Sequence, residues 1–211
     1  MNIVLASTSP RRNEILTRLG IPFTRIAVSI EEENLPKSKH VDVGEIPLRN
    51  ALLKARAAAL ALGRGKSEET AVIGADTVVV VDCTILPKPA DDEDARRMLR
   101  MLSGREHLVI TGVAVVLIPS GSEITGIEET KVKFRPLTEE EVSLYISTGE
   151  SADKAGAYGI QGCGSFLVEG IVGDYQNVVG LPIVLLYNLM KEAGADLFKI
   201  AARSISGNVH I

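Results

Sequence analysis

AVIGADTVVVVD, residues 71–82, is rich in β-branched side chains and almost continuous in hydrophobicity. Such a run is typical of a strand that is covered on both faces, since a strand with one face in water would alternate apolar and polar residues. One ionisable residue, Asp76, lies near the start of the run. Burying its carboxylate costs on the order of several kcal/mol unless the group is paired or bound to a metal ion. An aspartate that only caps a turn at a strand end is the alternative explanation.

Strand and helix patterns alternate on both sides of this run. Further strands are predicted at residues 2–6, 23–29, 107–118 and 125–134. Helices are predicted at residues 10–20, 46–62, 91–102, 138–147 and 181–193, with loops and short strands at 154–180. Helices separate the early strands, whereas the two long later strands pair locally. The sequence therefore predicts an α/β fold with a mixed, twisted sheet and flanking helices.

The composition limits the class of protein. The 211 residues suffice for one domain with a substantial core. The formal net charge of −4 argues against broad binding to nucleic-acid polymers, which needs an excess of Lys and Arg. Cys83 and Cys163 are the only cysteines, and no apolar run approaches the ~20 residues of a membrane helix. We therefore expect a cytoplasmic protein without a membrane span, a disulfide framework or a thiolate zinc site.

The segment LASTSPRR, residues 5–12, joins a short strand to the start of a helix. Ser9 is a suitable N-cap, and the helix would present free backbone N–H groups and its positive dipole end to an anion. Arg11 and Arg12 lie in the first turn, where a cation opposes the dipole unless a negative group is near. A polyphosphate would explain both arginines, with the Ser7 hydroxyl as a further donor. A capped surface helix with two solvated arginines explains the local pattern equally well.

Three lysines and a glutamine are further candidates for binding an anionic ligand. Lys54 lies in the predicted helix 46–62, Lys88 between two prolines, and Lys154 beside a glycine-rich segment. The flanking prolines reduce the entropy cost of holding a ligand at Lys88. Gln161 lies among glycines, where the backbone can approach a flat ligand and the amide can both donate and accept. Taken singly, the lysines are explained as exposed residues and the glutamine as a turn residue.

Carboxylates are candidates for holding a metal ion. Asp76 together with Glu32, from the acidic turn at residues 31–33, would supply the oxygen ligands that Mg²⁺ prefers. An acidic run by itself is more often a solvated loop. The metal site is therefore predicted from Asp76 first and from Glu32 second.

Other familiar motifs are incomplete in this chain. GRGKS at 63–67 lacks the first glycine of a phosphate-binding P-loop, because residue 60 is Leu, and it follows a predicted helix instead of a strand. GIQGCG at 159–164 has the wrong glycine spacing for a dinucleotide-binding turn. The three histidines are scattered, so neither a zinc protease nor a serine hydrolase is supported.

Several separate motifs occur in an order that resembles one known family. They are LASTSPRR (5–12), the helix with Lys54-Ala55, GADT (74–77), KP (88–89), LSGREH (102–107), DKAGAYGIQG (153–162) and NVVGLP (177–182). The set resembles the Maf family of nucleotide pyrophosphatases, relatives of the inosine triphosphatase group, over roughly residues 2–193. The resemblance implies a domain over residues 1–195 with two lobes around a cleft, and frequently a homodimer. Residues 196–211 form a C-terminal tail beyond it.

The resemblance also implies an activity. Maf proteins hydrolyse a nucleoside triphosphate to the monophosphate and pyrophosphate with a divalent metal cation, Mg²⁺ or Mn²⁺. SPRR together with AYGIQG is similar to the branch that acts on dTTP and UTP, because the branch that acts on 7-methyl-GTP usually has a bulky residue where Arg11 stands. We therefore expect a hydrolase acting on acid anhydrides that removes non-standard or excess nucleotides.

By similarity, particular residues receive roles. Substrate binding is implied for Ser7, Arg11, Arg12, Lys54, Lys88 and Gln161. Asp76 would be the catalytic carboxylate that activates a water, with Glu32 as its partner in catalysis and metal binding. Glu31 and Glu33 are interchangeable with Glu32 by inspection. The sequence PKP around Lys88 replaces the more usual GKP, which leaves the conformation of that loop open.

Two other functions stay open at this point. A nucleotide-binding regulator of septum formation and cell division would use the same pocket without turnover. A purine-preferring pyrophosphatase of the inosine triphosphatase type would cleave a different set of nucleotides. Pyrophosphate release from a panel of triphosphates separates the three.

Overall fold

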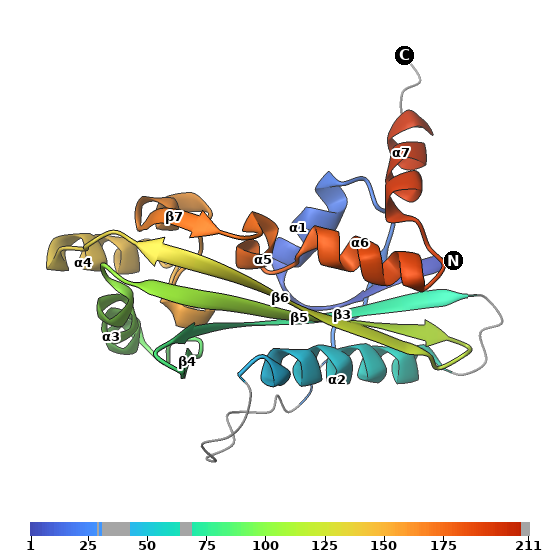
Figure 1. The fold of residues 1–211 in the computed structure, drawn as a ribbon, viewed down its shortest axis with the longest axis horizontal. Helices are drawn as coiled ribbons and strands as arrows, with labels where there is room; N and C mark the ends of the chain where they lie inside the picture. Colours follow the sequence, from blue (N-terminus) through green and yellow to red (C-terminus); the bar gives the residue numbers. More distant parts are fainter. Residues whose placement is uncertain (29, 31–42, 64–68, 208–211) are drawn as a thin grey trace.

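The computed structural model describes residues 1–28, 30, 43–63 and 69–207, and within these residues the strands form one seven-stranded mixed sheet (Figure 1). The strands are β1 Asn2–Ala6, β2 Thr24–Arg25, β3 Thr70–Val81, β4 Thr84–Leu86, β5 Glu106–Ile118, β6 Glu123–Phe134 and β7 Val168–Val172. Their order is β2-β1-β3-β5-β6-β7, with β4 also paired to β3. β1 runs parallel to β2 and β3, and the other pairs are antiparallel.

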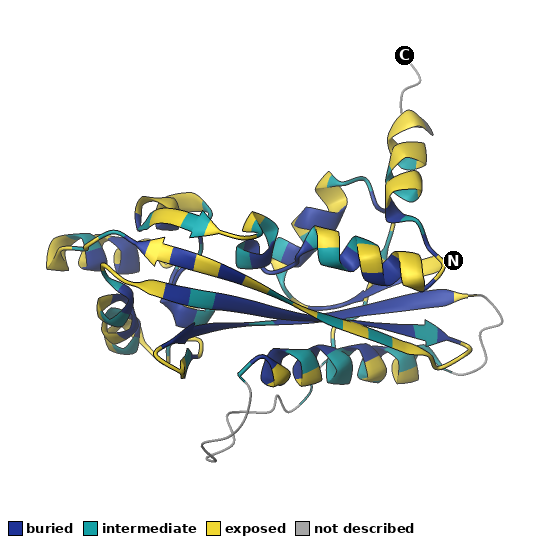
Figure 2. Cartoon of the chain, in the orientation of Figure 1, coloured by how far each residue is buried: buried dark blue, intermediate teal, exposed yellow. Residues whose placement is uncertain are grey.

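Helices cover both faces of this sheet. They are α1 Pro10–Arg18, α2 Glu45–Leu62, α3 Asp92–Leu102, α4 Glu139–Ser147, α5 Tyr175–Val179, α6 Ile183–Glu192 and α7 Leu197–Gly207, with two 3-10 helices, η1 Ala155–Ala157 and η2 Gly162–Phe166. Figure 1 shows α2 along one face, α1, α5 and α6 along the other, and α3 and α4 at one end of the long strands. The central strands are buried between these layers (Figure 2), which is why β3 is apolar on both faces.

Separate apolar cores lie toward the two ends of the long strands. One is built around residues such as Leu16, Ile73 and Leu186, between the sheet and the α1–α6 layer. The other joins α3 and α4 to the far ends of β5 and β6, through residues such as Met98 and Phe134. The two cores agree with the two lobes that the family resemblance implies.

Two glycines set the distance between α2 and the sheet. A β carbon on Gly74 of β3 would lie 2.1 Å from the carbonyl oxygen of Ala51, and one on Gly112 of β5 would lie 2.4 Å from the amide nitrogen of Leu48. The helix consequently rests on bare strand backbone. Asp76 shares the face of Gly74, two residues earlier on β3, and pairs with Gly112 in the register of β3 and β5. The close approach therefore brings Asp76 directly beside α2.

The edge of β3 that faces β1 is interrupted. Its first part, residues 70–74, pairs with β1, and its last part, residues 79–81, pairs with β4. On the opposite edge, β5 pairs with β3 continuously from Thr70 to Val80. Residues 75–78 thus face a break between β1 and β4. The end of a parallel strand at such a break is a common place for ligands in open α/β sheets.

The structure confirms most of the predicted elements and corrects some boundaries. The strand predicted at residues 23–29 is too long, because β1 has five residues and pairs with β2 only through Val4 and Leu5. β4 and α5 were not predicted as separate elements. Asp91 caps α3, and Thr138 with Glu141 forms the predicted capping box of α4.

The segment after residue 195 is helical. α7 follows the α6 helix, and Leu197 is buried in the core between α1 and α6. Phe198, the next residue, is 76% exposed. The predicted tail therefore begins with an anchored helix.

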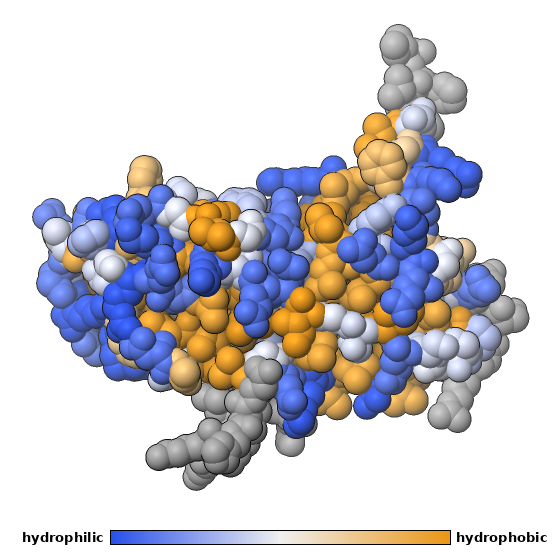
Figure 3. Space-filling model, viewed as in Figure 1, coloured by the Kyte–Doolittle hydropathy of each residue, from blue (hydrophilic) through white to orange (hydrophobic). Residues whose placement is uncertain are grey.

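The hydropathy of the visible surface changes along the molecule (Figure 3). The end formed by α3 and α4 is mostly hydrophilic, whereas apolar surface gathers nearer α1 and α6. Exposed apolar side chains there include Val184 of α6. The homodimer implied by the resemblance stays a prediction.

Candidate active site at the break in the sheet

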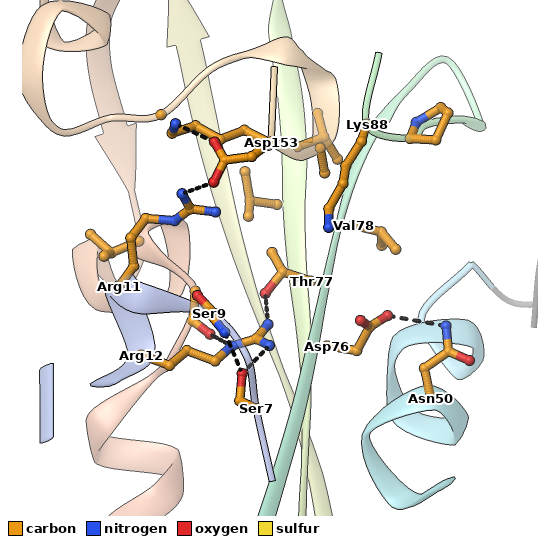
Figure 4. A pocket seen from close by; sticks show the side chains of 18 of the residues that line it. Ser7, Ser9, Arg11, Arg12, Asn50, Asp76, Thr77, Val78, Lys88 and Asp153 are labelled. Carbon is orange, nitrogen blue, oxygen red and sulfur yellow. Dashed lines mark hydrogen bonds and ion pairs between the residues drawn. The ribbon is translucent and has the colours of Figure 1, made fainter. Parts of the chain in front are cut away.

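A cavity of about 900 Å³ opens at the break between β1 and β4. It is lined by every described residue of the predicted site: Ser7, Arg11, Arg12, Lys54, Asp76, Lys88 and Gln161. These residues come from the β1–α1 turn, α1, α2, β3, the loop after β4 and the loops around η1 and η2, and Figure 4 shows several of them converging. Glu32 lies outside the described residues, as do the other glutamates of the acidic turn. The fold thus gathers segments separated by up to about 150 residues into one hollow.

Asp76 is held between two donors from α2. Its side chain is 13% exposed, and one carboxylate oxygen accepts a 2.6 Å hydrogen bond from the Lys54 ammonium. The other oxygen accepts a 3.1 Å bond from the Asn50 amide. Asn50 and Lys54 are four residues apart, so they share one face of the helix. This pairing compensates the cost of burying the carboxylate.

Asn50 was missed by the sequence reasoning, although a signal was present. Once Lys54 is a candidate, the residue one helical turn earlier faces the same ligand. The turn-capping alternative for Asp76 is wrong, because its carboxylate lies between α2 side chains at a strand centre.

Arg12 lies on the other side of β3 and is only 8% exposed. Its Nε donates to the Gly180 carbonyl oxygen at 2.7 Å, and Nη1 donates to the Ala75 carbonyl oxygen at 2.8 Å. Nη2 donates to the Thr77 hydroxyl at 3.0 Å. A longer bond of 3.4 Å joins Nη1 to the Ser7 hydroxyl (Figure 4). Arg12 therefore binds three separate segments of the chain.

The Ser7 hydroxyl also accepts a hydrogen bond from the backbone N–H of Ser9, at 3.2 Å. Ser9 occupies the N-cap position of α1, but its side chain makes no capping bond. The prediction that Ser9 is the N-cap of α1 is therefore confirmed in position, although no side-chain capping bond accompanies it.

Arg11 points to the opposite wall of the cavity. Its Nη1 lies 3.1 Å from a carboxylate oxygen of Asp153, and the two side chains are 27% and 58% exposed. Asp153 also binds the Lys154 ammonium at 2.6 Å, and Arg11 and Lys154 hold its pKa below the usual value against the opposing effect of burial. In Figure 4 Lys88 extends into the same space from its loop. This wall thus carries Arg11 and Lys154, both paired with Asp153, and the exposed Lys88.

The glycine-rich loops of this wall are stabilised from behind by Glu150. Its carboxylate accepts hydrogen bonds from the backbone N–H groups of Cys163 at 3.0 Å and Gly164 at 3.3 Å. Both amides lie in the first turn of η2, whose N-cap is Gln161. Glu150 therefore fixes the backbone that carries Gln161.

Buried aromatic contacts attach the same loops to the sheet. Nε2 of His107, on β5, lies 2.7 Å from the Tyr158 hydroxyl, and the rings of His107, Phe134 and Tyr158 meet edge to face. Burial lowers the pKa of His107 to about 4 and raises that of Tyr158. Both groups are consequently neutral at pH 7, so this contact is structural.

The donor set fits a metal ion that is held partly by a ligand. Mg²⁺ in nucleotide sites is usually bound by one or two carboxylates plus phosphate oxygens. Asp76 supplies one such carboxylate to the cavity. Among the residues that the structure describes, no group of three His, Cys, Asp or Glu side chains is arranged to hold an ion alone.

Comparison with known sequences now identifies the family. The sequence model of the family described as Maf-like protein matches residues 2–193. This chain belongs to the Maf-like family. The resemblance found in the motifs and the α/β fold that it implies are thereby confirmed.

Maf-like relatives of this chain are similar over nearly their full length. A protein of Dictyoglomus thermophilum is 46% identical over 92% of this chain and 97% of its own. Relatives from Moorella thermoacetica and Deinococcus radiodurans are 48% and 44% identical, over 93% and 94% of this chain and 97% and 96% of theirs. Each is named dTTP/UTP pyrophosphatase. In the described part of this chain, no helix is long and apolar enough to cross a membrane.

Proposed function

We propose that this Maf-like protein hydrolyses dTTP and UTP to the nucleoside monophosphate and pyrophosphate. The names of its full-length relatives support the substrates. The single structural observation that carries the proposal is Asp76, a carboxylate set among cations in a cavity large enough for a nucleotide. Hydrolysis of an anhydride requires charge neutralisation, an aligned water and a leaving group held in place.

The two walls of the cavity divide these tasks. Asp76 would accept a proton from the attacking water, since it is the buried carboxylate on β3 and its position is fixed by Lys54 and Asn50. Arg11 and Lys88 would neutralise the phosphates from the opposite wall. Lys54 would bind a phosphate oxygen while keeping Asp76 in place. The cations that line the cavity would thus neutralise the negative charge of the triphosphate.

A divalent cation would share the site with the substrate. Asp76 is the described residue that would hold it, and Glu32 is the second residue that the sequence indicates. When bound, Mg²⁺ or Mn²⁺ supplies further neutralisation of the phosphate oxygens.

Base recognition would fall to Gln161. Its amide has both a donor and an acceptor, as a pyrimidine edge requires. Its backbone is held by Glu150 through η2, so the amide can be presented in a defined orientation. We also propose a cytoplasmic location, which is supported by two exposed free thiols, Cys83 and Cys163.

The test is pyrophosphate release from dTTP, UTP, dCTP, ATP, ITP and 7-methyl-GTP with Mg²⁺ or Mn²⁺. We expect the highest kcat/KM with dTTP and UTP. Hydrolysis in H₂¹⁸O should place the label in the monophosphate, because water attacks the α-phosphorus. Tight nucleotide binding without release of pyrophosphate would favour a regulator, and a preference for ITP would favour a purine-specific pyrophosphatase. Label in pyrophosphate would contradict the proposed attack.

A further inference from the structure

We propose that Arg12 is a positioning residue for Asp76 and makes no direct contact with the triphosphate. The inference rests on the proposed function, since it concerns how the proposed base, Asp76, is held. It departs from the sequence-based expectation that both arginines bind phosphate. The argument comes from what the guanidinium of Arg12 contacts and from where β3 lacks a neighbouring strand.

The contacts of Arg12 involve residues on both sides of Asp76. Nη1 donates to the backbone carbonyl of Ala75 and Nη2 to the side chain of Thr77, at 2.8 and 3.0 Å. Asp76 lies between these two residues, and its own carboxylate points to the other face of β3. The guanidinium of Arg12 is a rigid planar fork of N–H donors, and because it binds both neighbours of Asp76 it limits rotation of Asp76 itself.

The place of these contacts is the break in the sheet. β1 pairs with β3 as far as Gly74, and β4 begins to pair at Val79. The carbonyl of Ala75 faces this break, where a strand amide would otherwise donate to it. Buried backbone carbonyls are almost always satisfied. Arg12 therefore replaces the missing strand at the position next to Asp76.

The remaining contacts anchor the fork. Nε donates to the Gly180 carbonyl in the turn before α6, at 2.7 Å. The Thr77 hydroxyl also lies 2.9 Å from the hydroxyl of Thr111 on β5. Thr111 in turn donates to the carbonyl of Asn177 on α5, at 3.4 Å. The guanidinium thus belongs to a buried polar network that spans β3, β5 and α5, and reorienting it toward a ligand would break several hydrogen bonds.

Arg11 provides an internal comparison. It is adjacent in sequence, yet its side chain is 27% exposed and bound to a carboxylate that is 58% exposed. A phosphate can displace such a partner at little cost, because exposed ion pairs are weak. The helix dipole argued for an anion near the two arginines. The guanidinium of Arg12 instead donates to carbonyl and hydroxyl oxygens of the chain itself.

The experiment compares lysine substitutions at the two positions. Arg12→Lys keeps the charge but removes the three-way fork, whereas Arg11→Lys keeps a cation near solvent. We expect Arg12→Lys to lower kcat for dTTP about 100-fold, since a small displacement of a catalytic group can cost that much. Its Kd for α,β-methylene-dTTP should stay within about threefold of wild type. Arg11→Lys should keep kcat and raise KM.

A second variant keeps the inference testable if Arg12→Lys does not fold. If thermal denaturation shows that Arg12→Lys is unfolded, Thr77→Val removes one acceptor of the fork without changing side-chain volume much. It should lower kcat about tenfold with analogue binding retained. Analogue binding weakened tenfold or more in a folded variant, with kcat within twofold of wild type, would overturn the inference and leave the pyrophosphatase function standing. A wild-type protein that releases no pyrophosphate would instead refute the function.

Discussion

The two walls of the cavity are built in different ways. The sheet wall consists of β1, β3 and α2, and its polar groups are buried and bound to one another, as with Asp76, Lys54 and Asn50. The loop wall carries Lys88 and Gln161 on short loops rich in glycine and proline. Strand pairing and helix packing fix the first wall. The second is attached by a few contacts from behind.

This difference teaches how the site can combine precision with adaptability. Groups that move protons must keep their geometry within a fraction of an ångström, which rigid elements provide. Groups that recognise a ligand can lie on loops over a rigid scaffold. Substitutions on the sheet wall should therefore change kcat, and those on the loop wall should change KM.

The largest effect is expected from Asp76→Asn. Loss of a general base should lower kcat by about 10²–10⁴. The matched control is Asp153→Asn on the loop wall, which removes a partly exposed carboxylate that binds Arg11. Stopped-time measurement of pyrophosphate gives kcat and KM for both variants. A near-normal kcat in folded Asp76→Asn would contradict its role as general base. It would also contradict the expected difference between the two walls.

The next effect concerns the attachment of the loop wall through His107. Its pKa is about 4 in the folded protein and 6.5 when unfolded, so below pH 6.5 the unfolded chain takes up a proton that the folded chain does not. Stability from this group is complete above pH 6.5 and is lost as the pH falls toward 4, by about 3 kcal/mol. Urea unfolding of wild type and His107→Gln at pH 7 and pH 4 measures it. Equal pH dependence in the two proteins would contradict the assignment.

A smaller effect is expected where α2 rests on the sheet. Gly74→Ala places a methyl group 2.1 Å from the Ala51 carbonyl oxygen, so α2 must move away from β3. Such overpacking costs about 1–3 kcal/mol, and kcat should fall because Lys54 and Asn50 move relative to Asp76. Gly170→Ala on β7 is the control, because its β carbon would meet no atom within 4 Å. Calorimetry and kcat of both variants test the prediction, which fails if the two behave alike.

The smallest effect is expected at the loop wall itself. Gln161→Ala should raise KM for dTTP and UTP about tenfold and leave kcat within threefold, since one or two hydrogen bonds to the base are lost. Inhibition by pyrophosphate is the control and should not change, because the phosphate contacts remain. A large fall in kcat with constant KM would mean that the loops also shape the chemistry.

The sequence was most informative about residues whose type conflicts with their surroundings. A carboxylate in an apolar strand drew attention to Asp76, and the alternation of strands and helices predicted the mixed sheet. Thr77 and Asp153 were not predicted, because their importance comes from contacts with residues more than 60 positions away. The contacts of Arg12 with Ala75 and Gly180 could not be predicted for a related reason. Local helix electrostatics gave no sign that a break in a distant strand pair would supply its partners.

The break between β1 and β4 also has a consequence for engineering. A continuous sheet separates its two faces, so a ligand bound on one face cannot contact side chains on the opposite face. Here the cavity at the interruption is lined from both sides of β3, where Asp76 faces α2 and Thr77 binds Arg12. A redesign of substrate preference should therefore leave both faces of β3 unchanged and be confined to the loop wall.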